Sequence, residues 1–515
     1  MFGIAVPQVR PWTETSPSRA SMSFRGRRQA VSGQLKPLFE SVARASDSRL
    51  WLGLSLWFLL VGVITQTLIP LTLIAVSPDS GGFQAIALEL LAKMQTSGWS
   101  AWHLWPEQQA PAGISAAIYY ATGMTSPIVV LPLLSATHAT SAVILEKLVR
   151  GGLGGRPTYR LPALLMALLP SSLVIVSTVH KDAFSILGIF CILYAFHKIR
   201  DGVSRPTSWT SLAVATALLI FGAVLIFVVR AYLLHLVLAG AIVLSAAMLA
   251  GRLLDSRRVG GDLVRLAGGL VCALVLLVAI IRILSLTAAL PDGTMANDDI
   301  QVQAEAAPVA SLPIASASLS VAVTQPVSAG TSEQPNPVRT VEATPALPAA
   351  VPCAVPEFVR GRSRVLIDVR EHLLLMAPTA YSNIDAAVRL ESGCDIAAYA
   401  PRAMEIGMLS PFPAMWLGAA GSHQSGLAIA ISAAQMLLYY ACLLALVAGI
   451  AVSRHVRGFV PVMLFCIVIV TIYGIAIPNV GTLYRERMFS VFLLCGVGLP
   501  ILLDLLQGRY RALRA

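Results

Sequence analysis

Three short charged stretches interrupt long apolar runs of this chain. They are "HKD" at 180–182, "RAY" at 230–232 and "YRER" at 484–487. Lysine and arginine side chains bind phosphate oxygens, and arginine does so through two parallel hydrogen bonds. A carboxylate beside them can accept the proton of a hydroxyl group. These residue types therefore indicate a site for a phosphate leaving group and a hydroxyl nucleophile.

Each candidate also has a purely structural interpretation. Lys181 suits a solvated turn with its stem along apolar surface, and Asp182 suits the cap of the next helix. Arg230 suits an anchor at a membrane interface. Glu89 suits the polar face of an amphipathic helix, and Asp79 suits a loop position in "SPDSGG". Both interpretations stay open at the level of the sequence.

The candidate site residues fall into two groups. The candidate catalytic residues are charged and lie after the first apolar run or in the turns: Asp79, Glu89, Lys181, Asp182 and Arg485. The candidate substrate-binding residues lie in the same turns or in the polar segment before residue 426: Arg230, Tyr232, Asn479, Tyr484, Arg487, Arg402 and Asp385. The spacing of His, Cys and acidic residues matches no metal site, so we expect neither a metal nor another cofactor.

The composition of the chain is typical of a membrane protein. Of the 515 residues, 56% are hydrophobic and 12% are charged. Several runs of 18 or more residues with few charges are long enough to cross about 30 Å of hydrocarbon as a helix. The net charge of +11 is spread in short groups between apolar runs, so nucleic-acid binding is not expected. The predicted fold class is an all-α polytopic membrane protein.

The sequence predicts about ten membrane spans. They cover about 51–76, 127–147, 161–179, 183–199, 209–229, 232–250, 264–286, 427–452, 459–477 and 489–506. A single helix over 161–199 would be roughly 58 Å long, too long for a bilayer. We therefore expect two short helices there, with "HKD" at the turn.

The distribution of Lys and Arg predicts the orientation of the spans. The first 50 residues are rich in Arg, and so is every second connection, such as "KIRDGVSR" and the tail "GRYRALR". Because positive charge marks cytoplasmic connections, both termini are predicted to be cytoplasmic. The three charged turns then share the extracytoplasmic face.

Five regions follow from these patterns. They are a basic cytoplasmic tail (1–50), a seven-span membrane domain (51–290), a disordered Ala/Pro-rich extracytoplasmic tether (291–363), extracytoplasmic amphipathic helices (364–426), and a three-span domain with a basic cytoplasmic tail (427–515).

Short amphipathic helices are predicted outside the spans. Among them are "NIDAAVRLE" at 383–391 and a helix with an apolar stripe from Phe83 to Met94. If the long polar segment is extracytoplasmic, Cys353 and Cys394 could form a disulfide there.

Four stretches resemble bacterial multi-pass proteins of surface-polysaccharide assembly. They are "AAIYYATG", "LPALLMALLPSSLVIVSTVHKDAF", "YAPRAMEIGMLSPFPAMW" and "PNVGTLYRERM". This group is similar to the GT-C-type membrane glycosyltransferases and the polysaccharide polymerases. The resemblance covers roughly 50–200 and 365–500.

The resemblance implies sugar transfer from a polyprenyl phosphate or pyrophosphate at the periplasmic face of the bacterial inner membrane. GT-C enzymes place an acidic residue in the first outer loop, where this chain has Asp79 and Glu89. The chain lacks an adjacent acidic pair there, which favours a polymerase that relies on arginine. The expected partners are a lipid-linked sugar or oligosaccharide and membrane lipids. The alternatives are a transporter or flippase for lipid-linked glycans, and a non-catalytic scaffold that binds other polysaccharide assembly proteins.

Overall fold

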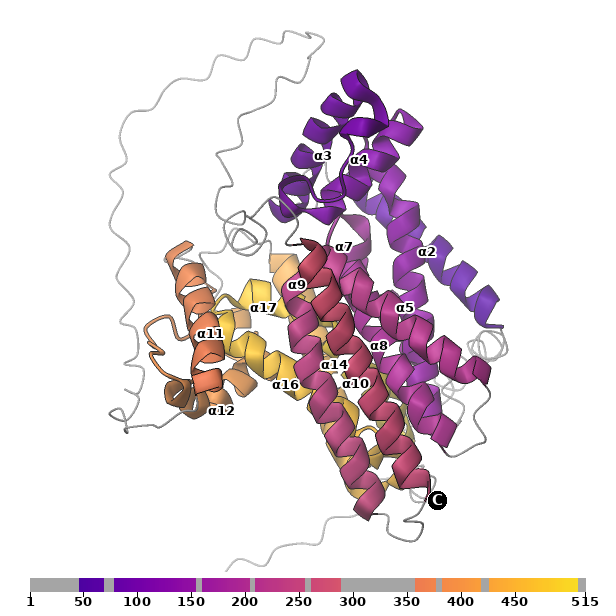
Figure 1. Ribbon diagram of the computed structural model, residues 1–515, viewed down its shortest axis with the longest axis vertical. Coiled ribbons are helices and arrows are strands. Elements are labelled where there is room, and N and C mark those ends of the chain that lie inside the picture. Colours follow the sequence, from indigo (N-terminus) through magenta and orange to yellow (C-terminus); the bar gives the residue numbers. More distant parts are fainter. Residues whose placement is uncertain are drawn as a thin grey trace, which may run out of the picture.

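The structure of the protein is a computed structural model, and it is helical throughout the part that it describes. The described residues are 46–68, 78–153, 160–203, 209–254, 261–288, 357–376, 382–417 and 426–507. Within these ranges there is no β-strand, and one isolated bridge joins Asn383 to Asn479. Figure 1 shows a bundle of long helices with smaller helices at one end and along one side.

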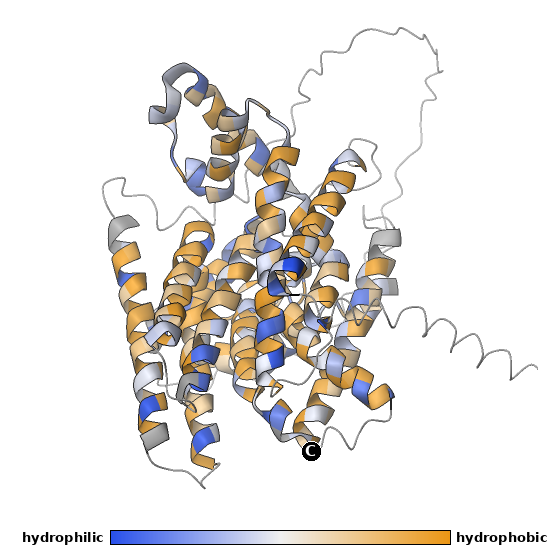
Figure 2. Ribbon diagram, turned by 90° about the vertical axis from the view of Figure 1, so that its right-hand side faces the viewer, coloured by the Kyte–Doolittle hydropathy of each residue, from blue (hydrophilic) through white to orange (hydrophobic). Residues whose placement is uncertain are grey.

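Eight helical segments among the described residues are long and apolar enough to cross a membrane. The elements that contain them are α2 (Asp47–Leu68), η4 with α5 (Pro127–Val130 and Leu131–Gly152), α8 (Asp182–Val203), α9 (Trp209–Leu254), α10 (Gly261–Ala288), α14 (Gly426–Val452), α15 with α16 (Arg454–Arg457 and Val460–Ala476) and α18 (Met488–Leu506). An all-α, multi-pass membrane protein is therefore confirmed. In Figure 2 most residues of the bundle have the colour of hydrophobic residues.

Helix α9 consists of two antiparallel halves. Its 46 residues contain a break at Arg230, where φ is −157° and ψ is 76°. Gly222 in the first half packs against Gly188 of α8, and Leu244 in the second half lines a small pocket with Leu193 of the same helix. A straight helix would separate Gly222 from Leu244 by roughly 33 Å, far more than the rise from 188 to 193 allows. The chain therefore reverses at Arg230, between the two predicted spans.

The predicted span at 161–179 is broken in the middle. It forms α6 (Leu161–Leu168) and α7 (Pro170–Ser177), because Leu169 precedes a proline and adopts an extended conformation. Gln435 of α14 satisfies the free backbone: its Oε1 accepts a hydrogen bond from the Ser171 amide at 3.1 Å. Residues 178–181 are not helical and lead into α8. "HKD" therefore lies at a turn between short helices, as predicted.

Residues 78–122 form a small helical unit, which we call the cap. It contains α3 (Pro78–Ser97), η2 (Gly98–Ala101), η3 (Pro106–Gln108) and α4 (Ala110–Thr122). The predicted apolar stripe of α3 is confirmed, since Phe83, Leu90 and Met94 are buried. The cap stands at one end of the bundle in Figure 1, and in Figure 2 it mixes hydrophilic and hydrophobic residues.

Two helices from the long polar segment lie beside α16 in Figure 1: α11 (Glu357–Met376) and α12 (Gly393–Leu409). The short helix α13 (Pro413–Leu417) follows. Two glycines allow α12 to lie directly on α16. A Cβ on Gly407 would lie 2.3 Å from the Val470 oxygen, and one on Gly474 would lie 2.1 Å from the Ala403 oxygen. Small residues thus permit close backbone approach.

Two predictions about this segment are wrong. The stretch 383–391 is not a helix: the backbone amide of Ile384 donates to the Pro478 oxygen at 3.0 Å instead of to a helical partner. The predicted tether does not extend to 363, because α11 begins at Glu357. The tether over 291–356 and Cys353 lie outside the described residues. Cys394 is disulfide-bonded, whereas the other described cysteines are free.

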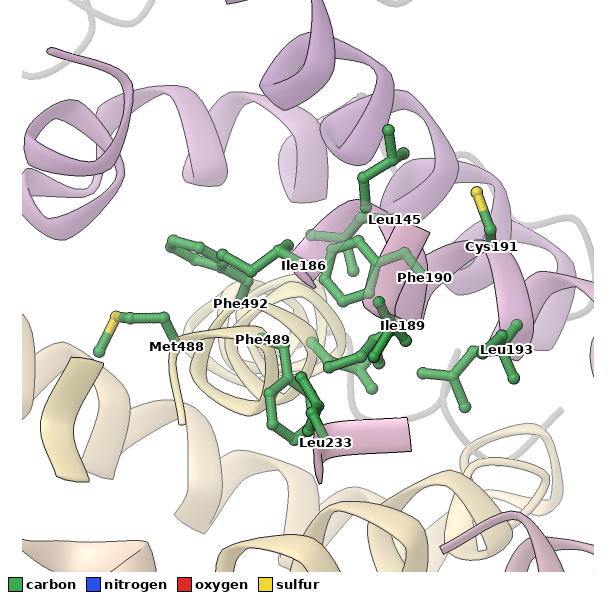
Figure 3. Packing of buried hydrophobic residues seen from close by; sticks show 14 of the residues in the cluster. Leu145, Ile186, Ile189, Phe190, Cys191, Leu193, Leu233, Met488, Phe489 and Phe492 are labelled. Atoms are coloured by element: carbon green, nitrogen blue, oxygen red, sulfur yellow. The ribbon is translucent and has the colours of Figure 1, made fainter. Parts of the chain in front are cut away.

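Buried apolar residues of α8 and α18 belong to the core of the bundle. Figure 3 shows Ile189 and Phe190 of α8 beside Phe489 and Phe492 of α18. Leu233, three residues after the bend of α9, belongs to the same buried cluster. This packing fixes the start of α8, the bend of α9 and the start of α18 relative to one another.

Charged side chains also gather where α5 and α8 end. Asp47 pairs with Lys147 at 3.2 Å and with Arg160 at 2.8 Å, and Asp201 pairs with His197 and Arg200. We call these six residues the far-end charge group. It lies at the end of α8 opposite to Asp182. Its basic residues belong to the side that the charge pattern predicts to be cytoplasmic.

Candidate functional site

The three charged turns meet in the structure. Arg230, at the bend of α9, lies between two carboxylates: its Nη2 is 2.5 Å from Asp182 Oδ1 and its Nη1 is 2.8 Å from Glu486 Oε2. Asp182 begins α8, and Glu486 ends α17 (Val480–Glu486). All three side chains are buried. One guanidinium group thus joins turns that lie 48 and 256 residues away from it in the sequence.

Two further basic residues lie beside this triad. Arg485 Nε is 3.7 Å from Asp182 Oδ2, and Lys181 is close enough to Glu486 to interact with its charge. Both are partly exposed to solvent, unlike Arg230. We call Lys181, Asp182, Arg230, Arg485 and Glu486 the ionic cluster.

The ionic cluster has an excess of positive charge at its accessible edge. Its buried part holds one guanidinium and two carboxylates, while its partly exposed part holds one ammonium and one guanidinium. At neutral pH the cluster as a whole is therefore cationic. A buried charge is tolerated only when it is paired. The buried carboxylates neutralise Arg230, and the exposed edge remains suited to an anion.

Local sequence explains how each turn is placed. A carboxylate at the start of α8 is favoured by the helix dipole, which is where Asp182 lies. Asn479 caps α17: its Oδ1 accepts a hydrogen bond from the Thr482 amide at 3.1 Å. Its Nδ2 donates to Ser382 Oγ at 2.8 Å. The role that the structure gives to Asn479 is thus to hold α17, which ends with Arg485 and Glu486.

Helix α11 and residues 382–385 bind the backbone that leads into α17. Val480 donates its amide to the Ser382 oxygen at 3.0 Å. The buried Arg370 of α11 donates to the Ile475 oxygen at 3.1 Å and to the Asp385 oxygen at 2.8 Å. These contacts connect α11 and the non-helical 382–385 to the backbone just before α17. The polar segment therefore positions one side of the ionic cluster.

Arg487 does not join the ionic cluster. It is buried, and its guanidinium donates hydrogen bonds to the backbone oxygens of Gly407 and Ser410 at the end of α12. Its guanidinium also lies 5.7 Å from the ring of Tyr484. Burial raises the pKa of Tyr484 to about 12, so that phenol stays neutral. Both residues connect α12 with α17, and their predicted contact with a substrate stays a prediction.

Asp385 and Arg402 form a separate group. Arg402 Nε lies 3.0 Å from Asp385 Oδ2, and its Nη1 lies 3.0 Å from Glu405 Oε2. Tyr399 also donates a hydrogen bond to Asp385, at 3.2 Å. The hydrogen bond to Asp385 raises the pKa of Arg402 further above its usual value. This group braces the turn before α12 rather than the ionic cluster.

The two candidate carboxylates after the first span are Glu89 and Asp79. Glu89 is exposed on α3 and pairs with Lys93 at 2.8 Å, which lowers the pKa of Glu89. Glu89 is therefore a polar-face residue of an amphipathic helix. Asp79 lies near the start of α3, and its side chain lies outside the described part. Phe83, one turn further along α3, lies 5.9 Å from the Lys181 ammonium and 6.5 Å from the His180 ring.

Glu486 and Phe83 are the residues that sequence reasoning missed as parts of the site. Glu486 stands between two arginines in "YRER", and successive residues of a helix point about 100° apart. The side chains of Arg485, Glu486 and Arg487 therefore point in three different directions. This spacing indicates that the three residues have different partners. Tyr232 is half-exposed, and its hydroxyl lies 3.5 Å from Glu486 Oε2. Nothing in the sequence alone pairs Phe83 with Lys181.

Comparisons with known proteins add no assignment: no family model, curated protein or solved structure matches this chain. Among the described residues, no group of three His, Cys, Asp or Glu side chains has the geometry of a metal site. The site must therefore be interpreted from its own chemistry.

Proposed function

We propose that this chain is an integral membrane glycosyltransferase or polysaccharide polymerase that uses a polyprenyl phosphate- or pyrophosphate-linked sugar at the periplasmic face of the inner membrane. The observation that supports the proposal is the ionic cluster, in which three turns far apart in the sequence contribute to one cationic edge. A lipid-linked donor presents its phosphate at the level of the headgroups, near the ends of membrane helices. Lys181 and Arg485 lie at such helix ends.

The proposed reaction is attack of an acceptor hydroxyl on the anomeric carbon of the donor sugar. The new bond forms between this oxygen and the anomeric carbon, while the bond from that carbon to the phosphate oxygen breaks. The polyprenyl phosphate or pyrophosphate leaves with the bonding electrons. Lys181 and Arg485 stabilise the charge that develops on it.

Glu486 is the best-placed acceptor for the hydroxyl proton. Burial raises the pKa of its carboxyl group, although the nearby Arg230 opposes this. A raised pKa makes a carboxylate a better base near neutral pH. Tyr232 is the half-exposed neighbour of Glu486 and offers a phenol to a sugar. Asp182 is held between two arginines and orients them.

The test is turnover of a synthetic polyprenyl-pyrophosphate oligosaccharide by the purified chain in lipid nanodiscs. Lys181→Ala and Arg485→Ala are expected to lower the transfer rate about a hundredfold each, as for other lost charge stabilisation. Lys147→Ala, in the far-end charge group, is the matched control and should keep the wild-type rate. Unchanged transfer by both cluster variants would contradict the proposed site.

A transporter for lipid-linked glycans is the alternative that a specific observation favours. Transporters often contain broken membrane helices with polar side chains at the break. The break between α6 and α7, where Gln435 meets Ser171, is such a feature. The two functions separate in vesicles: a transporter moves a labelled lipid-linked glycan across the bilayer with no glycosidic bond made or broken.

A further inference from the structure

The cap, which contacts Lys181 of the ionic cluster through Phe83, carries an exposed group of aromatic rings. Trp99 and Trp102 are 53% and 37% exposed, and Tyr120 is partly exposed. The Trp99 ring lies 4.9 Å from the Tyr120 ring and 6.5 Å from the Trp102 ring, both edge to face. We call these three residues the aromatic platform. Because its rings pack against one another, the platform presents fixed faces to solvent.

The fold holds the platform rigidly. The indole nitrogen of Trp102 donates to the Gly113 oxygen of α4 at 3.0 Å. A Cβ on Gly113 would lie 2.2 Å from the Leu104 oxygen, so this loop lies directly on α4. Only the ring faces, and not the indole N–H of Trp102, remain available for a ligand.

The loop that bears the platform also touches the chain beside the ionic cluster. Trp105 donates its indole N–H to the Val228 oxygen at 2.9 Å, two residues before Arg230. At the other side of the cap, Phe83 lies over Lys181. The cap therefore contacts the ionic cluster at Lys181 and the chain beside it at Val228, and the platform lies on the same unit.

The surroundings of the platform are polar. Exposed residues near it in the sequence are Lys93, Ser97, Ser100, His103 and Glu107. Glu107 and Gln108 adopt positive φ angles of 46° and 59°, which non-glycine residues hold only when the fold demands it. The buried Gln109 has an Oε1 that accepts no hydrogen bond from the described residues. Exposed aromatic rings whose exposed neighbours in the sequence are hydroxyl, imidazole, ammonium and carboxylate groups suit a sugar better than a lipid tail.

We propose that the aromatic platform binds the sugar rings of the glycan that the ionic cluster processes. The C–H bonds on one face of a pyranose carry partial positive charge, and the face of an aromatic ring is negative. The ring planes of Trp99 and Trp102 lie at 71° to each other, so they offer stacking to two sugars whose rings are turned relative to one another. This inference deepens the proposed function by adding a glycan-binding site to it, and it rests on that function for the choice of ligand.

The experiment measures oligosaccharide binding to the full chain in nanodiscs. The probes are cellohexaose, chitohexaose and laminarihexaose, and the readout is calorimetry. We expect saturable binding of at least one probe, and a loss of about tenfold or more in affinity for the variant Trp99→Ala/Trp102→Ala. The control variant is Trp209→Ala, which removes an exposed tryptophan at the first residue of α9. This variant should bind the probes as the wild type does.

Three results would overturn the proposal. They are no binding of any probe, binding that survives in the double variant, and strong quenching of Trp99 and Trp102 fluorescence by brominated lipids, which would make the platform a membrane anchor. The proposed function is tested separately by Lys181→Ala, which should lose transfer and keep oligosaccharide binding. If transfer is absent from the wild type and binding is present, the glycan site stands and the enzyme proposal falls.

Discussion

Arg230 and Lys147 both pair with an aspartate at an end of the bundle, but in different surroundings. The side chains of Arg230 and Asp182 are 7% and 2% exposed, whereas those of Lys147 and Asp47 are 33% and 36% exposed. Buried charges lose their hydration and depend on one another, while exposed charges keep their water. The pair of Lys147 and Asp47 can thus form wherever the sequence places basic and acidic residues near each other on the surface. The ionic cluster forms only when the fold brings its three turns together.

The difference teaches where a function can be sought. A buried and fully paired triad is costly to build, and natural proteins keep such groups for specificity or chemistry. The partly exposed pair of Lys147 and Asp47 at the other end is explained by topology alone. The ionic cluster is therefore the part of the chain in which a function is best sought.

The largest expected effect is that of Arg230→Met. The substitution leaves Asp182 and Glu486 buried without their shared partner, so the free energy of unfolding should fall by about 3–5 kcal/mol. Unfolding in mixed micelles titrated with SDS measures this change. A loss of less than about 1 kcal/mol would mean that water reaches the triad and that the comparison between the two ends fails.

Removing the whole triad should cost less than removing its centre. In the triple variant Asp182→Leu, Arg230→Met and Glu486→Met, no buried charge is left unpaired. We expect it to regain about 2 kcal/mol or more relative to Arg230→Met alone, because well-packed apolar groups often replace a buried ion pair at little cost. The same SDS titration measures it. Equal losses in the single and triple variants would assign the destabilisation to packing at the bend of α9.

Asp47→Asn tests the far-end charge group. Asp47 itself and its partner Lys147 are partly exposed, although its second partner Arg160 is buried, so we expect a loss of about 1 kcal/mol. The matched variant is Asp182→Asn, which should lose several times more. Raising the salt concentration should weaken the effect of Asp47→Asn and leave that of Asp182→Asn unchanged. Equal losses would show that burial does not separate the two ends.

The smallest effect is expected for Glu89→Gln. Its pair with Lys93 is fully exposed on α3, and exposed i, i+4 pairs contribute little. The melting temperature should not change measurably in a thermal scan of the purified chain. A clear decrease would indicate that Glu89 has a partner that the isolated chain does not provide.

The sequence predicted the local features of this fold well. Length and hydropathy identified the spans and the turn at "HKD", because each follows from neighbours along the chain. The break of the predicted span 161–179 before Pro170 was not predicted. The apolar stripe of α3 followed from its helical period. The bend at Arg230 separated two predicted spans in the same way. These features need no knowledge of long-range contacts.

The long-range pairings could not be predicted. Charge placement suggested that Lys181, Arg230 and Arg485 share one face, but no pattern paired Arg230 with Glu486, which lies 256 residues away. The same limit explains the error at 383–391, whose helical period was overridden by backbone hydrogen bonds to residues 478–480. Likewise, Arg487 meets the end of α12 only after both helices are in place.

The abrupt reversal of α9 at Arg230 also constrains how the chain enters a bilayer. The two halves are joined without a polar loop, so no hydrophilic connection separates the insertion of the first half from that of the second. One passage of Arg230 through hydrocarbon is costly unless its charge is compensated. Of the two carboxylates that pair with Arg230, Asp182 at the start of α8 is the nearer in the sequence, and it is synthesised before Arg230. We therefore expect α8 and both halves of α9 to leave the insertion machinery together as one three-helix unit.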